Sequence, residues 1–263
     1  MNIAVCHLAF SMNTLADNLH KLCRAADMAG RCGADWLVTP EMALQGYYFS
    51  KNSAGIQPQM LKKNSYENVL DPLLDRIRRY GMTLFLGTGE KDEKGQLFNS
   101  FWVLNRQGVL AAEHRKTVVP RGGAEDWACP GMVTEPVSVD GISAGILVCA
   151  DAWKAELGIT LARQGAEFVI DGAAWAFSPC CPDPVGVWKT FSRRSGLPLL
   201  VANQTGQTPW MDMRPAMSAL LDRGELCDSY AGGEALLTAC WDREHHTWTG
   251  GFRVIPFADT ADS

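Results

Sequence analysis

Three residues with the chemistry for acyl transfer each follow an apolar, strand-like segment. Glu41 ends the segment LVTPE, Lys116 follows LAAEHR, and Cys149 ends GILVC. A cysteine attacks through its thiolate, so it needs a base to take its proton and donors that stabilise the oxyanion formed by the attack. In open α/β sheets, ligand sites gather at the carboxyl ends of strands. We therefore expect a carboxylate, an ammonium group and a thiol to meet in one acyl-transfer site.

Each of these residues also has a purely structural interpretation. A free cysteine at the end of a buried strand is more often a core residue, a glutamate after proline can cap a helix, and a lysine after arginine can be exposed to solvent. We favour a joint role because all three follow strands. Glu41 is then the general base, Lys116 stabilises the negative charge of the tetrahedral intermediate, and the backbone N–H of Ala150 is a second oxyanion donor.

The elements that must position these residues alternate between strand-like and helix-like patterns, which predicts an α/β layered fold. Apolar residues at helical spacing predict helices over 14–33 and 66–81, about 153–164, and near 185–195. Strand-like runs occupy 2–10, 35–41, 82–90, 96–105, 109–116, 135–139, 142–149, 166–172 and 198–206, with later strands around 216–221 and 234–240. No linker-like stretch divides them, so we expect a single domain.

Composition excludes several classes of function. A net charge of -5 gives no basic footprint for nucleic acid, and no apolar run approaches the roughly 20 residues of a membrane span. The N-terminus has no basic region and is interpreted as a first strand rather than a signal peptide. Nine cysteines without a CxxC pair predict reduced thiols in a cytoplasmic protein with no metal site. The adjacent Cys180 and Cys181 have poor geometry for one zinc ion, and we assign them no role.

Two segments of the chain share one pattern. RCGADWLVTPE and RQGAEFVIDGA both combine a helix end, a turn and a buried strand. The two halves could form related layers whose strand tips converge on one site. Equally, many helix-to-strand turns contain glycine and alanine, and both interpretations stay open.

The segments GADWLVTPEMALQGY, EHRKTVVP and CADAWKAE resemble, in order and spacing, the three motif blocks of the nitrilase superfamily, the carbon–nitrogen hydrolases. The resemblance extends to NSFWVLNRQGVL and PLLVANQTG, and it implies a four-layer αββα sandwich that usually pairs into a homodimer. It implies one carbon–nitrogen hydrolase domain over residues 1–255, with a loose tail over 256–263. It also implies hydrolysis of a C–N bond through a Glu-Lys-Cys triad and a thioester, without a cofactor.

The resemblance assigns roles residue by residue. Glu41 matches the general base, Lys116 the catalytic lysine and Cys149 the nucleophile, while Glu125 matches a second glutamate that positions the substrate or supports the lysine. Tyr47 and Trp175 fall in segments that line the family's pocket. Three further residues are expected to be structural: Asp151 and Glu156, which hold the turn after the nucleophile by hydrogen bonds, and Asn203.

The chain departs from the family pattern directly after the nucleophile, where Ala150 replaces the usual aromatic residue. True nitrilases tend to have Cys-Trp-Glu here, so Cys-Ala-Asp favours a small amide or carbamoyl substrate over a nitrile. An acyltransferase or amide synthase on the same triad stays open, and a non-catalytic scaffold is disfavoured by the complete triad. The GISAG segment matches the serine-hydrolase motif, but Ser143 lies early in a strand instead of on a strand-to-helix turn, which disfavours a serine esterase.

Overall fold

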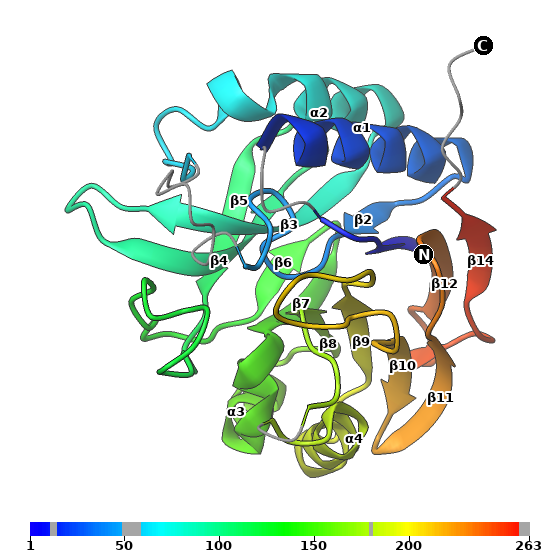
Figure 1. The fold of residues 1–263 in the computed structure, drawn as a ribbon. Helices are drawn as coiled ribbons and strands as arrows, with labels where there is room; N and C mark the ends of the chain where they lie inside the picture. The colour runs from blue at the N-terminus through cyan, green and yellow to red at the C-terminus, as the bar shows by residue number, and fades with distance from the viewer. Residues whose placement is uncertain (11–14, 49–58, 179–180, 258–263) are drawn as a thin grey trace.

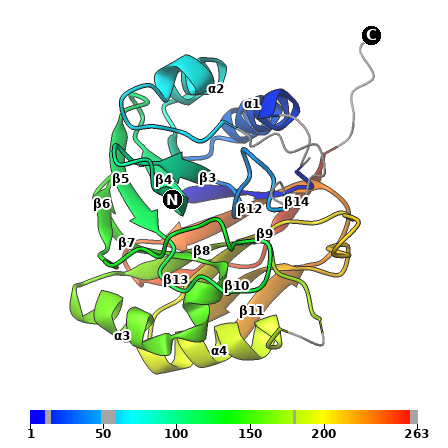
Figure 2. The ribbon, with the colours of Figure 1, turned by 60° about the vertical axis from the view of Figure 1, so that its left-hand side comes forward.

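Two β-sheets face each other in the middle of the molecule, and a pair of helices covers the outer side of each sheet (Figure 1). The computed structural model describes residues 1–10, 15–48, 59–178 and 181–257. The view in Figure 2 separates the four layers, with one helix pair above the sheets and the other below. This is the αββα sandwich that the sequence predicts.

The first sheet has eight strands in the order β13-β12-β1-β2-β3-β4-β5, with β14 paired to β12. Strands β1, β2 and β3 are parallel, whereas β4 and β5 continue as antiparallel hairpins. The bounds are β1 Asn2–His7, β2 Trp36–Val38, β3 Thr83–Lys91, β4 Leu97–Leu104, β5 Leu110–Arg115, β12 Ala235–Asp242, β13 Thr247–Trp248 and β14 Arg253–Pro256.

The second sheet has six strands in the order β11-β10-β9-β8-β7-β6. Here β7, β8 and β9 are parallel, and the strands on either side are antiparallel to them. The bounds are β6 Val137–Val139, β7 Ile142–Val148, β8 Phe168–Ala173, β9 Leu199–Asn203, β10 Ser218–Asp222 and β11 Glu225–Tyr230. Each sheet thus contains a parallel trio whose carboxyl ends can carry a site.

The two halves that share a sequence pattern occupy matching places in these sheets. Strand β2 is the middle strand of one parallel trio, and β8 is the middle strand of the other. Helices α1, Leu15–Arg31, and α2, Glu67–Tyr80, cover the first sheet, while α3, Ala155–Arg163, and α4, Pro184–Ser195, cover the second (Figure 1). The structure therefore favours the interpretation that the two segments form related layers.

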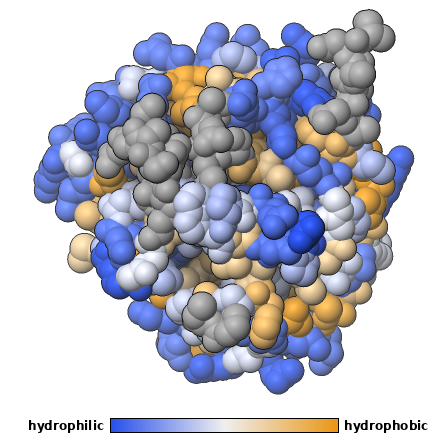
Figure 3. All heavy atoms as spheres, in the orientation of Figure 1, coloured by the Kyte–Doolittle hydropathy of each residue, from blue (hydrophilic) through white to orange (hydrophobic). Residues whose placement is uncertain are grey.

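Alternation along β1 shows how the core is divided. Ile3 and Val5 face the other sheet and join a core cluster that both sheets supply, whereas Ala4 and Cys6 face α1 and α2. The sheets approach each other closely at Gly172, where an added Cβ would lie 2.0 Å from the ring of Phe101. On the molecular surface that faces the viewer in Figure 3, hydrophobic residues form small separate patches among hydrophilic ones.

Most expected elements are present, including the hairpin between β6 and β7. Its turn residues Asp140 and Gly141 have φ of 52° and 74°, as a two-residue turn of type I′ requires. Strands β11, β13 and β14 were not expected. The expected domain boundary at residue 255 falls inside β14, and Phe257 is buried, so the chain is ordered beyond it. The rest of the expected tail, residues 258–263, lies outside the described residues.

Candidate active site

Glu41 lies in a turn three residues after β2, at the carboxyl end of the parallel trio. The turn packs against Gly87 of β3, where an added Cβ would lie 2.1 Å from the carbonyl oxygen of Pro40. The N–H of Gly87 donates to Thr39 Oγ1 at 2.8 Å. Only a glycine at position 87 allows this close approach, so β3 fixes the backbone that carries Glu41.

Lys116 follows β5 and joins two carboxylates. Its Nζ donates to Oε1 of Glu41 at 2.7 Å and to Oε1 of Glu125 at 2.6 Å. The amide of Asn99, from β4, donates to the same two oxygens at 2.7 Å and 3.2 Å. The side chains of Glu41, Lys116 and Glu125 are 0%, 0% and 2% exposed. The structure thus brings these three sequence-predicted residues together in a buried ion cluster.

The second oxygen of Glu41 contacts the other sheet. Its Oε2 accepts a hydrogen bond at 3.0 Å from the N–H of Ala174, directly after β8. The amide of Gln204, directly after β9, donates to the carbonyl oxygen of Glu41 at 2.7 Å. Glu41 therefore lies between the carboxyl ends of both parallel trios.

Cys149 directly follows β7 and opens a 3-10 turn, η2, Cys149–Trp153. Its φ is 52°, in the left-handed region that side chains with a Cβ disfavour, and the residue is 7% exposed. Ala150 is the next residue of the turn and is 1% exposed. Strained backbone of this kind clusters at functional sites, because it aims a side chain out of regular structure.

Burial dominates the electrostatics of the site. It raises the pKa of Glu41 to about 8, with Lys116 opposing the shift and Glu125 adding to it. Burial also raises the pKa of Cys149 well above its ordinary value, reinforced by the negative charge of Glu41 and opposed by Lys116. For Lys116 burial disfavours the charged form, but Glu125 and Glu41 outweigh it and the pKa is raised. Burial therefore favours the neutral forms of both the Cys149 thiol and the Glu41 carboxyl.

The predicted pocket residues Tyr47 and Trp175 pack against Met42, next to Glu41, and against Trp153 of η2, respectively. Burial raises the pKa of Tyr47, and the charges of Glu125, Glu41 and Cys149 add to the shift. Trp175 follows β8 and its ring packs edge-on against Trp153 of η2, with ring centres 6.0 Å apart. Their role as walls of a substrate pocket stays a prediction.

The three residues expected to be structural behave differently from one another. Asp151 accepts hydrogen bonds from both sides of the site, including one from the N–H of Val148 at 3.0 Å. Asn203 holds the backbone of Trp175 through its Oδ1 and Nδ2, at 3.0 Å and 2.7 Å. The expectation for Glu156 is wrong: its side chain is 67% exposed and pairs with Arg194 on the surface of α3 and α4. Helix α3 begins at residue 155, which turns Glu156 away from the nucleophile.

Sequence reasoning missed three polar residues that support the site. Asn99 bridges the carboxylates, Asp171 accepts the N–H of Cys149, and His114 contacts Asp151. The signal available was an asparagine or aspartate inside an apolar strand, where these residue types are rare. Of the unassigned cysteines, Cys181 is half-buried and free, and Cys180 lies outside the described residues.

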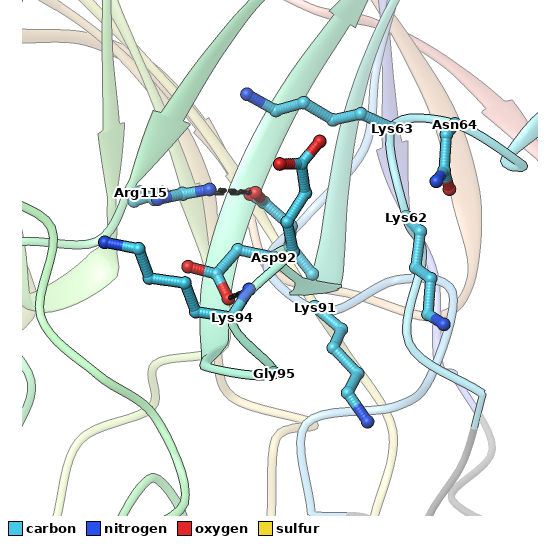
Figure 4. A pocket seen from close by; sticks show the side chains of 10 residues that line it. Lys62, Lys63, Asn64, Lys91, Asp92, Lys94, Gly95 and Arg115 are labelled. Atoms are coloured by element: carbon cyan, nitrogen blue, oxygen red, sulfur yellow. Dashed lines mark hydrogen bonds and ion pairs between the residues drawn. The ribbon is translucent and has the colours of Figure 1, made fainter.

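A surface pocket of about 710 Å³ is lined by none of the candidate active-site residues (Figure 4). The pocket is lined by residues 62–64, by residues 90–95 at the end of β3 and the turn that follows it, and by Arg115. Together these segments provide five cationic and three acidic side chains. Arg115 pairs with the buried Glu90, whereas the lysine chains extend in different directions. The lysine ammonium groups do not converge on one point, so we place no catalytic group in this pocket.

The residues that the structure describes contain neither a multi-residue metal-ligand cluster nor a helix that could span a membrane. No cluster of three or more histidine, cysteine, aspartate or glutamate side chains there could hold a metal ion. Within the same residues, no helix is both long and apolar enough to cross a membrane.

Solved structures of the same fold support the architecture. A carbon–nitrogen hydrolase from Helicobacter pylori G27 superposes with a TM-score of 0.77 and 20% identity, covering 90% of this chain and 87% of that one. A mutant amidase from Nesterenkonia sp. AN1 in complex with butyramide gives 0.78 and 21%, covering 90% and 89%. The fold is that of the nitrilase superfamily.

Sequence comparison then identifies the family. The model of the carbon-nitrogen hydrolase family matches residues 2–225. A glutamine-dependent NAD(+) synthetase from Rhodobacter capsulatus is 30% identical over 174 residues, which are 64% of this chain and 30% of that protein. A citrullinase from Francisella tularensis is 27% identical over 188 residues, 70% of this chain and 64% of the citrullinase. The chain therefore spans less than two thirds of these relatives. It belongs to the carbon–nitrogen hydrolase family.

Proposed function

We propose that this enzyme hydrolyses a small amide or carbamoyl compound through a thioester on Cys149. One observation carries the proposal: the ammonium group of Lys116 is fully buried between Glu41 and Glu125, within range of the thiol. Keeping an ion cluster dry is costly, and replacing such groups by apolar residues often stabilises a protein. A cluster with an extra carboxylate beside a strained cysteine is best explained by catalysis.

The first half-reaction forms the thioester. Glu41 takes the proton of the Cys149 thiol while the sulfur attacks the carbonyl carbon, and the carbonyl electrons move onto oxygen. Lys116 Nζ and the backbone N–H of Ala150 stabilise that oxyanion. Ala150 can take this role because it directly follows Cys149 in the turn η2. When the C–N bond breaks, Glu41 returns the proton to the nitrogen, and ammonia or an amine leaves.

The second half-reaction restores the enzyme. Glu41 takes a proton from water, whose oxygen attacks the thioester carbon, and a second oxyanion forms in the same place. The C–S bond breaks, the acid leaves and the sulfur regains its proton from Glu41. Glu125 and Asn99 hold Lys116 and Glu41 in position through both steps. No step requires a metal or an organic cofactor.

The substrate class rests on similar proteins. The Nesterenkonia amidase has been crystallised with butyramide and with acrylamide, and one of its structures shows covalent addition of an acetamide moiety at the active-site cysteine. The citrullinase and the glutamine-dependent synthetase are named for a ureido and an amide compound. These names favour amides and carbamoyl groups over nitriles. Capture of the thioester by an amine would give acyl transfer on the same residues.

The test is release of ammonia or amine from a panel of butyramide, glutamine, citrulline, N-carbamoyl amino acids and simple nitriles. We expect wild type to turn over an amide or ureido compound and Cys149→Ala to turn over none. Ser143→Ala should stay active, because Ser143 lies inside β7 and its N–H is bound to Glu167. Turnover by Cys149→Ala would contradict the proposal. Product analysis with added amines separates hydrolysis from acyl transfer.

A further inference from the structure

Asp171 is a buried carboxylate next to the candidate nucleophile that the proposed reaction does not use. It lies in β8 and is 0% exposed. Its Oδ1 accepts a hydrogen bond from the N–H of Cys149 at 2.6 Å, and its Oδ2 accepts one from Nε1–H of Trp188 at 3.0 Å. Burying a carboxylate against two neutral donors is unfavourable, and an asparagine could accept the first bond without that cost.

The bond to Cys149 falls where β7 ends. In the parallel pairing, Val148 lies opposite Gly172, and this is the last pair between the two strands. Cys149 then turns into the left-handed region with φ of 52°. An L-residue holds this conformation only when its surroundings enforce it. The carboxylate of Asp171 receives the N–H that has left the strand pairing, so it acts on the backbone at the point where the thiol leaves the sheet.

Trp188 fixes the second oxygen of the Asp171 carboxylate through its indole N–H. It comes from α4, is 0% exposed and packs edge-on against Trp175, with ring centres 5.5 Å apart. The indole is packed within the buried core cluster, so the direction of its N–H is fixed. A chain of fixed contacts therefore runs from α4 through Asp171 to the backbone of Cys149.

We propose that Asp171 is a positioning residue that holds the left-handed backbone of Cys149, and so the direction of its thiol, with Trp188 orienting the carboxylate. The inference rests on the role of Cys149 as nucleophile proposed above. Asp171 makes no contact with the reacting atoms in this scheme. It acts through the cysteine.

Charge gives this role a second consequence. Burial raises the pKa of the Cys149 thiol, the negative charges of Glu41, Asp171 and Glu125 add to the shift, and the positive charge of Lys116 opposes it. Burial raises the pKa of Asp171 to about 7, with Asp151 adding to the shift, while the Cys149 N–H, Trp188 and Lys116 oppose it. The negative charge of Asp171 opposes thiolate formation in the resting enzyme. Removing that charge should make the thiol more acidic.

The experiment compares Asp171→Asn, Asp171→Ala and Trp188→Phe. Asp140→Asn and Trp36→Phe are matched controls, because Trp36 Nε1 donates to Asp140 at 2.8 Å and this second indole–carboxylate bond lies at the opposite end of β7. Iodoacetamide labelling of Cys149 is followed against pH by mass spectrometry of its peptide, which separates it from the other eight cysteines. Thermal midpoints are measured for all variants, and kcat and KM for the best substrate of the panel.

We expect Asp171→Asn to shift the labelling profile about one pH unit lower and to keep kcat within about tenfold, because it retains an acceptor for the Cys149 N–H. Asp171→Ala should lower kcat about 100-fold with KM within about twofold, since a misdirected nucleophile affects the chemical step. The kcat of Trp188→Phe should lie between those of Asp171→Asn and Asp171→Ala. The controls should change thermal midpoints only.

The positioning role is wrong if Asp171→Ala folds and keeps the wild-type kcat and labelling profile. It is also wrong if the controls shift the profile equally. Should the alanine variant not fold, Asp171→Asn decides through its labelling profile, which needs no substrate. Turnover by Cys149→Ala is a separate outcome that removes the proposed nucleophile, whatever the Asp171 variants show.

Discussion

Nε2 of His114 lies 2.8 Å from the carboxylate of Asp151, and this buried pair joins the segment that carries Lys116 to the turn that begins at Cys149. The other carboxylate oxygen accepts hydrogen bonds at 2.9 Å and 2.8 Å from the two backbone N–H groups that follow Lys116. One side chain therefore links the segment after β5 in one sheet to the turn after β7 in the other.

Asp151→Ala should lower the free energy of unfolding by about 3 kcal/mol or more, because several buried donors lose their acceptor. Burial opposes ionisation, but the bonds from His114 and the backbone hold the pKa of Asp151 below 3.8. Its contribution is therefore present above pH 3.8 and lost as the pH falls further. In urea unfolding between pH 7 and pH 3, the difference in unfolding free energy between wild type and variant should decrease only below about pH 3.8.

The exposed pair of Asp212 with Arg214 provides the control, since Asp212→Asn should leave stability unchanged. If the difference in unfolding free energy between wild type and Asp151→Ala stays constant down to pH 3, the charge of Asp151 does not have this role.

The activity of wild type should rise with pH as Glu41 loses its proton. Burial raises the pKa of Glu41 to about 8, so kcat/KM should increase up to about pH 8 and level above it. Glu41→Gln should lower kcat at least about 100-fold at all pH values, because no base remains. The measurement is initial rates from pH 5.5 to pH 9.5.

Glu90→Gln is the matched control, because Glu90 is equally buried but accepts from Ser100 and Trp102 away from the cluster. It should cost stability and leave the pH profile unchanged. A profile that is flat from pH 6 to pH 9 would contradict Glu41 as the base.

Lys116→Met should lose both activity and stability. It leaves Glu41 and Glu125 facing each other without a cation, which costs about 3 to 5 kcal/mol when one partner of a buried pair is removed. Loss of the oxyanion donor should lower kcat about 100- to 1,000-fold. The double variant Lys116→Met/Glu125→Gln should regain part of the stability and none of the activity.

Lys63→Met tests a lysine in an exposed pair with Glu113 and should change neither property measurably. If the double variant is no more stable than Lys116→Met, the carboxylates do not repel each other as the geometry implies.

His7 should make the fold sensitive to mild acid. It is 0% exposed, its Nδ1 lies 3.0 Å from Ser218 Oγ, and burial lowers its pKa to about 4. The unfolded chain binds the proton below about pH 6.5, so stability is complete above that pH and is lost as the pH falls toward 4, by about 3 kcal/mol in total. His7→Gln should flatten the dependence of unfolding free energy on pH between 6.5 and 4. His20→Gln, on the exposed face of α1, should retain the wild-type dependence.

The sequence pattern was sufficient for the layered fold and for placing Glu41 and Lys116 at strand ends, while Glu125 was assigned only through the family resemblance. Apolar runs of period two and 3.6 mark buried strands and helices, and residues that follow parallel strands collect at one edge. The prediction of one αββα domain is confirmed. The homodimer and the cytoplasmic location stay predictions, which light scattering and cell fractionation can test.

The supporting residues could not be predicted because they depend on contacts between sheets. Nothing in the pattern around Asp171 says that its strand pairs beside β7 or that Trp188 of α4 lies beneath it. Asn99 likewise acquires its role only because β4 passes under two carboxylates from distant loops. Sequence periodicity gives the face of a strand, whereas partners across layers follow from the packed structure.

The division of the site between the sheets has a consequence for chains that are not fully folded. Glu41 and Lys116 come from one sheet and Cys149 from the other, so the base and the nucleophile meet only after the layers dock. Before docking, during synthesis or after partial denaturation, the cysteine has neither its base nor its ammonium neighbour. The proposed hydrolysis therefore requires the docked sheets, and a chain that opens between its layers loses the arrangement of base, ammonium group and thiol.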